Sequence, residues 1–215
     1  MGLNIEPRLN LVDHNVDHWK TNRVTVDQAS QIAALFTLAA LLGFIVMAVG
    51  LIGGRYSERL AAFRDWGVDA LGPYAMWFGW TVAAVSLLGS IYFSEVADFL
   101  PCNLCWYQRI AMYPLVVILA IAAARKDVAV RRYVYPLVGV GMVFATYHHF
   151  MQLYPSIETG VCGTDVSCVT RDIWEFGFVS FPLMALAGFL LIAASLAVAA
   201  RYHSETRLAS AHSPD

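Results

Sequence analysis

The sequence predicts an all-α membrane protein, a four-helix transmembrane bundle with one additional N-terminal transmembrane helix. Of its 215 residues, 59% are hydrophobic and only 14% are charged, which is far from the composition of a soluble domain. Five stretches of 25 residues or more carry no charge except Arg109. About 20 apolar residues already cross a bilayer as a helix, the form in which the backbone satisfies its own hydrogen bonds. The stretches are 28–54, 70–94, 99–124, 133–157 and 176–200.

The five spanning helices are expected, in chain order, at about 30–52, 72–93, 104–124, 133–152 and 177–200. The first follows about 30 polar residues, so we interpret it as a retained helix rather than a cleaved signal peptide. The chain then divides into a polar N-terminal tail, an extra helix with its cytoplasmic loop, a four-helix core and a cytoplasmic tail. The bounds of these parts are 1–29, 30–71, 72–200 and 201–215.

The distribution of lysine and arginine predicts the orientation, because loops rich in these residues stay in the cytoplasm. Nine of the 14 lie on one side of the predicted helices and four on the other. The nine are Arg55, Arg59, Arg64, Arg125, Lys126, Arg131, Arg132, Arg201 and Arg207. The C-terminus is therefore expected in the cytoplasm, with loops 94–104 and 153–176 facing outward. The net charge of −2 gives no electrostatic reason to expect a nucleic-acid partner.

Two cysteines begin the third predicted helix, where Cys102 and Cys105 are separated by two residues. Thiols at the start of a helix lie near backbone N–H groups and the positive end of the helix dipole, which favours the thiolate. We interpret them as a redox pair at a membrane surface. The alternative is half of a zinc site that the other two cysteines complete. Haem attachment is excluded, because Trp106 occupies the position where CxxCH requires histidine.

The other two cysteines, Cys162 and Cys168, fall in the second outward loop. A structural disulfide across so short a loop gains only about 2 kcal/mol in the chain-entropy model. A flexible, exposed loop instead suits a disulfide that opens and closes repeatedly. Both interpretations remain open from this pair alone. A zinc site fits less well, because the spacing of this pair is wider than that of a CxxC knuckle.

One arginine and two histidines accompany the cysteines. Arg109 follows Cys105 by one helical turn, so that it can stabilise a thiolate or bind an electron-rich carbonyl. Alternatively, Arg109 snorkels to the lipid headgroups. His148 and His149 lie near the outward end of the fourth predicted helix, where one could hydrogen-bond a reduced acceptor or simply add interfacial polarity. Consecutive residues diverge by about 100° on a helix, so at most one histidine faces the site.

Electrons taken from a dithiol need an acceptor. The chain has no flavin, haem or nicotinamide fingerprint. A lipid-soluble quinone, ubiquinone or menaquinone, is the simplest acceptor, because it reaches the helix ends through the bilayer. Arg109 would then polarise the quinone oxygen as negative charge develops there.

Three motifs resemble the DsbB/BdbC family of disulfide bond formation proteins, which are membrane thiol:quinone oxidoreductases. They are PCNLCWYQR at 101–109, TYHHFMQLYPS at 146–156 and FGFVSFPLMAL at 176–186, and the resemblance spans about 72–200. It implies a multi-pass protein of the bacterial cytoplasmic membrane with its cysteine loops in the periplasm.

The resemblance also implies a relay of disulfides. A DsbA-like thioredoxin-fold partner exchanges with Cys162–Cys168, and Cys102–Cys105 reoxidises that pair. Quinone then takes the electrons beside Arg109. In the family's pattern Cys105 is the thiol next to quinone, and Cys102 is the one exposed to exchange.

The sequence departs from the family in its extra helix at 30–52 and in the short spacing of its second cysteine pair. The TYHH and QLYPS registers select His149 and His148 respectively, so the resemblance does not choose between them. Vitamin K epoxide reductase relatives match less well, because their loop cysteines precede the CxxC pair. The alternatives of another class are a membrane scaffold braced by two disulfides and a protein that binds metal through four thiolates.

Overall fold

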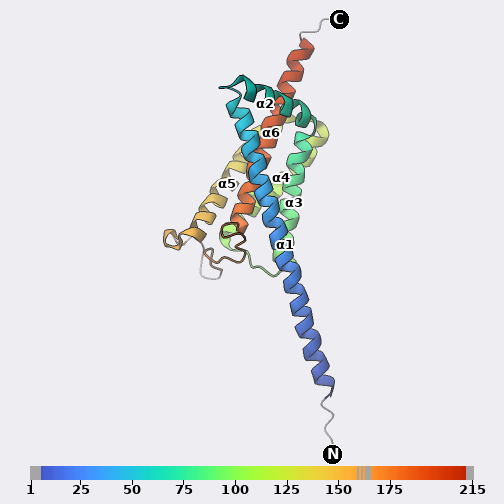
Figure 1. The fold of residues 1–215 in the computed structure, drawn as a ribbon, viewed down its shortest axis with the longest axis vertical. Helices are drawn as coiled ribbons and strands as arrows, with labels where there is room; N and C mark the ends of the chain where they lie inside the picture. The colour runs from blue at the N-terminus through green and yellow to red at the C-terminus, as the bar shows by residue number, and fades with distance from the viewer. Residues whose placement is uncertain (1–5, 159, 161, 163–165, 212–215) are drawn as a thin grey trace, which may run out of the picture.

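The computed structural model describes residues 6–158, 160, 162 and 166–211, with side chains described between Thr25 and Ser210. Within these ranges the chain is a helical bundle without strands (Figure 1). Five helices are long and apolar enough to cross a membrane. The predicted fold class, a four-helix bundle with one extra N-terminal helix, is therefore confirmed. The five candidate membrane-spanning segments are Thr25–Gly53, Glu58–Val96, Asn103–Arg125, Val128–Leu153 and Phe181–Ser210.

The described residues form six α-helices and four short turns of other helix types. The α-helices are α1 (Glu6–Gly53), α2 (Glu58–Leu71), α3 (Ala75–Ile91), α4 (Asn103–Arg125), α5 (Arg131–Leu153) and α6 (Phe181–Ala211). The short turns are η1 (Gly72–Tyr74), η2 (Tyr92–Val96), η3 (Val128–Val130) and η4 (Pro155–Ile157).

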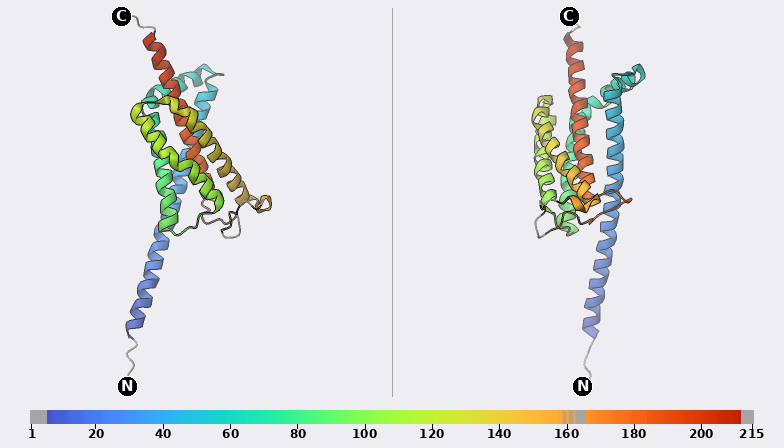
Figure 2. Two further views of the ribbon diagram at one scale, coloured as in Figure 1. Left: turned by 180° about the vertical axis from the view of Figure 1, so that it is seen from behind. Right: turned by 90° about the vertical axis from the view of Figure 1, so that its left-hand side faces the viewer.

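Helix α6 is the centre of the bundle. It packs against α1, α3 and α5, while α4 packs against α3 and α5. In its most apolar stretch 61% of residues are buried inside the protein, against 11% in α1. Phe189 of α6 is fully buried against Gly141 of α5, where any Cβ would collide with its ring. The core is therefore the four-helix unit, and α1 lies on its outside (Figure 2).

The helices extend further than predicted at both ends of the chain. Residues 6–29 continue α1, and residues 201–211 continue α6, where polar tails were expected. Neither 8–29 nor 201–211 contains glycine or proline, so nothing in the backbone stops the helix. Residues 1–5 and 212–215 of the predicted tails lie outside the described residues.

Two further differences concern connections. Residues 58–71, predicted as a loop, form α2. The last helix begins at Phe181 rather than near residue 177, because Gly177 has a φ of 81° and Glu175 pairs with Val179 in an antiparallel bridge. This turn ends the long connection after α5 and directs it into α6.

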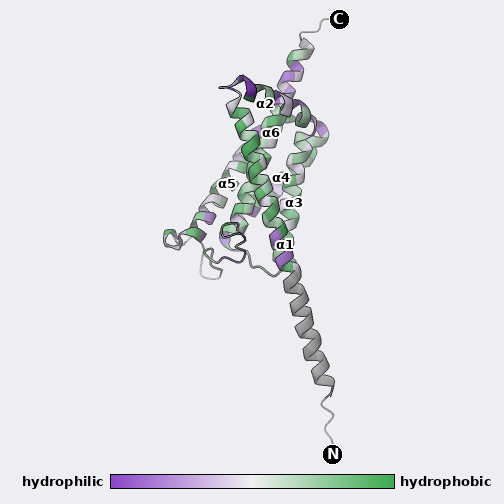
Figure 3. Cartoon of the chain, viewed as in Figure 1, coloured by the Kyte–Doolittle hydropathy of each residue, from purple (hydrophilic) through white to green (hydrophobic). Residues whose placement is uncertain are grey.

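The two ends of the bundle carry different elements. The start of α4, the end of α5 and the connection between α5 and α6 meet at one end, and the extension of α1 projects from the same end (Figure 1). The extension of α6 projects from the other end, beside α2 (Figure 1). Apolar residues dominate the middle of the helices, with polar residues at both ends (Figure 3). All four cysteines lie at the first end.

Candidate active site

The CxxC pair lies at the start of α4, as predicted. Cys102 is the N-cap residue, with extended backbone at φ −72° and ψ 173°, and its carbonyl accepts the first helical hydrogen bond from the Trp106 N–H at 3.1 Å. Cys105 follows in the first turn. The two Sγ atoms lie 3.2 Å apart, in a thiol–thiol hydrogen bond that either sulfur can donate. Both thiols are free, so the pair is reduced in this structure.

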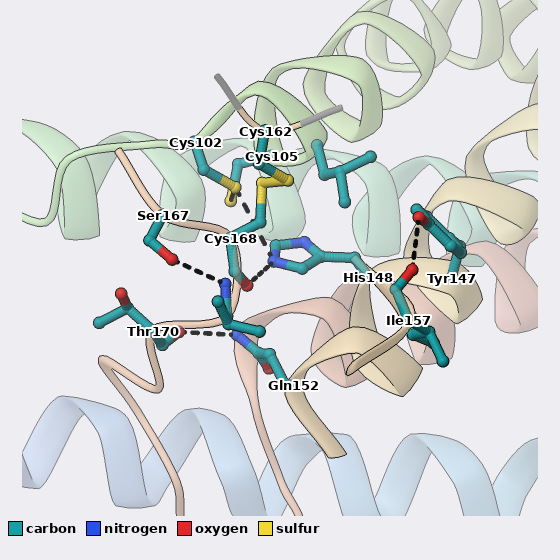
Figure 4. The surroundings of a disulfide bond; sticks show 12 residues. Cys102, Cys105, Tyr147, His148, Gln152, Ile157, Cys162, Ser167, Cys168 and Thr170 are labelled. Atoms are coloured by element: carbon teal, nitrogen blue, oxygen red, sulfur yellow. Dashed lines mark hydrogen bonds between the residues drawn. A yellow bond between two sulfur atoms is a disulfide. The ribbon is translucent and has the colours of Figure 1, made fainter. Parts of the chain in front are cut away.

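The second pair forms a disulfide between Cys162 and Cys168, with 5.8 Å between their Cα atoms. Both residues are buried, in a cluster with Cys102, Leu104 and Met151 (Figure 4). The expected exposed setting is therefore wrong for these two side chains, because the loop packs onto the start of α4 and the end of α5. Residues 163–165 of the loop lie outside the described residues. The fold brings all four cysteines together.

His148 of α5 joins the two pairs. Its side chain is only 2% exposed, and its Nε2 lies 3.1 Å from the Cys168 carbonyl oxygen and 3.8 Å from Cys102 Sγ (Figure 4). The buried amide of Gln108 donates to His148 Nδ1 at 3.0 Å and to the Leu104 carbonyl at 3.1 Å. With Nδ1 accepting, the proton of a neutral imidazole is on Nε2, which points toward the cysteines.

His149 points elsewhere. Its Nδ1 lies 3.0 Å from Ser180 Oγ, and its ring stacks on Trp174 with the centroids 6.3 Å apart. Arg171 covers the same indole ring at 4.2 Å. The expectation that only one of the two histidines faces the cysteines fits this geometry, and that histidine is His148.

The surroundings of Cys102 favour its thiolate. Its pKa is lowered from 9.0 to about 4, because hydrogen bonds from Cys105 and then from His148 stabilise the negative charge against the opposing effect of burial. Burial raises the pKa of the nearby Asp172 carboxyl, and a negative charge on Cys102 adds to the rise. The site therefore holds a nucleophilic sulfur at neutral pH although Cys102 is only 5% exposed.

A small cavity opens between the CxxC pair and the loop. Its volume is about 20 Å³, and Cys102, Cys105, His148, Gln152 and Asp172 are among its lining residues. This is room for about one water molecule. It is far too small to hold an aromatic ring.

Arg109 lies on α4 one turn beyond Cys105. Its Nη2 donates to the Ser90 carbonyl of α3 at 3.1 Å, and its guanidinium lies over the Trp106 ring at 5.3 Å. These contacts place the side chain between α3 and α4. Only one of its five N–H donors has a hydrogen-bond partner among the described residues, so the others can bind an acceptor oxygen.

The four-thiolate zinc alternative does not fit the structure. Cys162 and Cys168 are joined to each other and cannot act as thiolate ligands. Cys102, Cys105 and His148 place ligand atoms within 4.8 Å of one another, but the Nε2 of His148 already contacts Cys102 and Cys168. The cluster is better described as a dithiol packed on a disulfide.

Comparison with known proteins decides the family. The family model described as disulfide bond formation protein DsbB matches residues 73–199. The chain belongs to the DsbB family. The match covers α3 to α6 and leaves α1 and α2 outside, as expected for an extra N-terminal helix on a DsbB core.

Individual relatives of the chain are also disulfide formation proteins. The chain is 44% identical to disulfide bond formation protein C of Bacillus subtilis over 119 residues, which cover 54% of this chain and 86% of the relative. It is 37% identical to a probable disulfide formation protein of Coxiella burnetii over 139 residues, covering 64% of this chain and 94% of the relative. No solved structure matches. The chain is thus a multi-pass membrane oxidoreductase of disulfide bond formation.

Sequence reasoning missed the polar side chains that support the DsbB-family cysteines. Gln108 and Gln152 are both buried, and the Nε2 of Gln152 donates to the Thr170 carbonyl in the loop at 3.0 Å. Their spacing carried a signal, since Gln108 lies three residues after Cys105 and Gln152 four after His148. Residues at these spacings share a helix face.

Proposed function

We propose that this protein is a protein-disulfide:quinone oxidoreductase. It reoxidises a DsbA-like dithiol partner with a thioredoxin fold and passes the electrons to ubiquinone or menaquinone in the membrane. The observation that carries the proposal is the single buried cluster in which a reduced CxxC pair packs on a disulfide. Two redox pairs in contact, beside a membrane-facing helix, are the parts that an electron relay needs.

The proposed reaction has three exchanges, and each balances. The partner dithiol reduces the Cys162–Cys168 disulfide, and the partner leaves with a disulfide. The Cys162 and Cys168 thiols then reduce a Cys102–Cys105 disulfide, which restores the loop disulfide. Finally the Cys102 thiolate and the Cys105 thiol join in a disulfide and pass two electrons to the quinone, which takes one proton from Cys105 and the other from solvent. An intact loop disulfide and free CxxC thiols, as found in the structure, are the arrangement from which the last proposed step would start.

The roles of the two CxxC thiols follow from their surroundings. Cys102 is buried beside the loop disulfide and His148, so we assign it the exchange with the loop. Its lowered pKa makes it both a thiolate at neutral pH and a good leaving group. Cys105 is partly exposed and lies one turn from Arg109, so we assign it the reaction with quinone.

The residues near Cys105 fit a quinone. A quinone supplies an acceptor for two electrons and two protons, and its carbonyl oxygens accept hydrogen bonds. Arg109 has unused donors, and the half-exposed Trp106 beside it offers an aromatic face. We assign Arg109 to orient a quinone carbonyl and to stabilise the negative charge that develops on it.

The geometry leads us to assign His148 to the thiols and not to the quinone. Its Nε2 lies between Cys102 and the backbone of Cys168, where it can hold the Cys102 thiolate and move a proton during exchange. His149 contacts Ser180 and Trp174 instead, so we assign it no role in the relay.

The proposal includes an orientation. The arginine-rich end of the bundle lies in the cytoplasm and the cysteine end outside, in the periplasm of a cell with an outer membrane. Five spanning helices then place the N-terminal extension of α1 outside and the C-terminal extension of α6 inside, on opposite sides of the membrane.

A coupled assay tests the proposed function. Purified protein in detergent is mixed with a reduced thioredoxin-fold dithiol protein and a soluble quinone analogue, and quinone absorbance is followed. We expect catalytic quinone loss, and we expect Arg109→Gln to need at least tenfold more quinone for half-maximal rate (about 1.4 kcal/mol). Arg132→Gln is the matched control, because Arg132 is exposed at the opposite end of the bundle. Failure of the wild type with every dithiol and with both quinone types would favour a disulfide-braced scaffold.

A further inference from the structure

A second cavity lies at the end of the bundle opposite the cysteines. Its volume is about 550 Å³, and it is lined by residues of α1, α5 and α6 and by Arg55, which follows α1. Three arginines converge on it, Arg55, Arg131 and Arg201. Leu51 of α1 and Ala197 of α6 supply apolar wall. We call this cavity the arginine groove.

The groove exists because of how the extra helix packs. Helix α1 and helix α5 each pack against α6, but they make no comparable contact with each other among the described residues. Helix α6 presents Ala197 and Ala200 between them, and these small side chains leave the space unfilled. The groove is thus formed jointly by the DsbB-family core and by the helix that precedes it.

The positive charges in the groove have almost no partners within the chain. In the described part of the protein, neither the Arg55 nor the Arg131 side chain makes a hydrogen bond or an ion pair; only their backbone N–H groups are bonded. Arg201 has one partner among the described residues, Glu205, with Nε and Oε1 3.7 Å apart and both side chains more than a third exposed. Such an exposed pair neutralises little. No carboxylate lines the groove, so its field attracts an anion.

The depth of the groove indicates which anion. Arg55 lies two residues beyond the end of the span Thr25–Gly53, and Arg131 lies near the start of the span Val128–Leu153. This is the level of lipid headgroups, and Leu51 and Ile52 lie directly below it on the membrane side. A free phosphate would bind the arginines and leave the apolar wall exposed. A phospholipid would bind the arginines through its phosphate and cover the apolar wall with an acyl chain.

The geometry points to a binding site for an anionic phospholipid in the arginine groove, with its phosphate on Arg55, Arg131 and Arg201 and an acyl chain along α1 and α6. Basic pockets between transmembrane helices bind acidic headgroups in this way. The groove lacks a carboxylate for the ammonium of a zwitterionic lipid, so a net negative lipid is preferred. The bound lipid would join the extra helix to the core. The site is independent of the quinone relay.

Native mass spectrometry of the detergent-solubilised protein tests this site. The protein is titrated with phosphatidylglycerol, with phosphatidylcholine of the same acyl chains, and with inorganic phosphate alone. The double variant Arg55→Gln/Arg131→Gln is compared with the matched control Arg59→Gln/Arg132→Gln, which removes two exposed arginines outside the groove. Arg131→Lys keeps the charge and checks that changing this position leaves the protein folded.

We expect phosphatidylglycerol to bind more tightly than phosphatidylcholine. Each groove arginine contributes about 1 kcal/mol near a membrane surface, or about fivefold in affinity, so the double variant should bind roughly 25-fold more weakly. The control and Arg131→Lys should stay within about threefold of wild type. Equal affinity for both lipids, or an equal loss in the control, would overturn the proposal. Saturation by inorganic phosphate with no gain from the lipid would assign the site to a free phosphate instead.

Discussion

The two ends of the bundle contrast in how their polar groups are satisfied. At the cysteine end, His148, Gln108 and Gln152 are buried and make hydrogen bonds to neighbouring segments of the same chain. At the arginine end, Arg55 and Arg131 line an open groove and make no such bonds within the described residues.

The difference indicates two kinds of site. Buried groups that are bonded to neighbouring segments hold fixed positions, which suits chemistry between sulfur atoms. Charges without internal partners suit an external ligand that brings the opposite charge. If the cysteine end is preorganised in this way, changes to its buried polar groups should alter the chemistry of Cys102.

The protonation of Cys102 should show the largest effect. Its pKa is lowered from 9.0 to about 4 by the hydrogen bond from Cys105 and then by His148, so ultraviolet thiolate absorbance of the reduced protein should persist until the pH falls toward about 4. The same shift affects stability. Because the pKa of Cys102 is lower in the folded state, the reduced protein is stabilised at pH values above the pKa of the unfolded chain. This stabilisation is lost as the pH falls through the pKa of the folded state. Thiolate absorbance that appears only near pH 9 would contradict the lowered pKa of Cys102.

His148→Phe should lower the rate of dithiol-dependent quinone reduction by about 100-fold, because general acid–base help and thiolate stabilisation are both lost. His149→Phe is the matched control on the adjacent position and should stay within a few-fold of wild type, since His149 contacts Ser180 and Trp174 instead of the cysteines. Steady-state assays of both variants make the comparison. Equal losses would mean that the packing of α5, rather than the His148 imidazole, supports activity.

Gln108→Leu should have a smaller effect, about tenfold on the rate, because it leaves His148 Nδ1 unpaired and frees the ring to change tautomer. Gln108 is a positioning residue in this account, since it acts on the thiols through His148. A titration of thiolate absorbance is the discriminating measurement, because a purely structural role would lower stability without moving the Cys102 titration. We expect the thiolate to titrate at higher pH in the variant.

Ser30→Ala should have the smallest effect. Ser30 Oγ on α1 lies 2.7 Å from Glu175 Oε1 in the connection before α6, a polar link between the extra helix and the cysteine end. Its loss should cost roughly 1–2 kcal/mol of stability and leave quinone reduction within about twofold of wild type. Thermal unfolding and the coupled assay measure the two quantities. A large loss of activity would mean that α1 takes part in the relay.

The sequence was sufficient for features that depend on local pattern. Apolar length predicted the five spans, and spacing placed Cys102 and Cys105 at the start of a helix. The helical period also predicted that at most one of His148 and His149 faces the cysteines, because it fixes their relative directions. Which one does so depends on the rotation of α5 against its neighbours, and that is set by packing such as Phe189 on Gly141.

Features that depend on contacts between distant segments could not be predicted. The burial of Cys162 and Cys168 arises from the packing of the loop onto α4 and α5. The arginine groove needs the relative placement of α1, α5 and α6, although each arginine was already counted for topology. The helical form of residues 6–29 was not predicted, although no residue between 8 and 29 breaks a helix.

The central claim is that the Cys102 and Cys105 thiols deliver electrons to quinone while the loop disulfide stays intact. The direct measurement is a single turnover. Protein with reduced Cys102 and Cys105 and an oxidised loop is mixed with quinone and no partner, quenched in acid, alkylated, and mapped by mass spectrometry. The account predicts one quinol per protein, a new Cys102–Cys105 disulfide and an unchanged Cys162–Cys168 disulfide. No quinol, or quinol formed while Cys102 and Cys105 remain alkylatable, would contradict it.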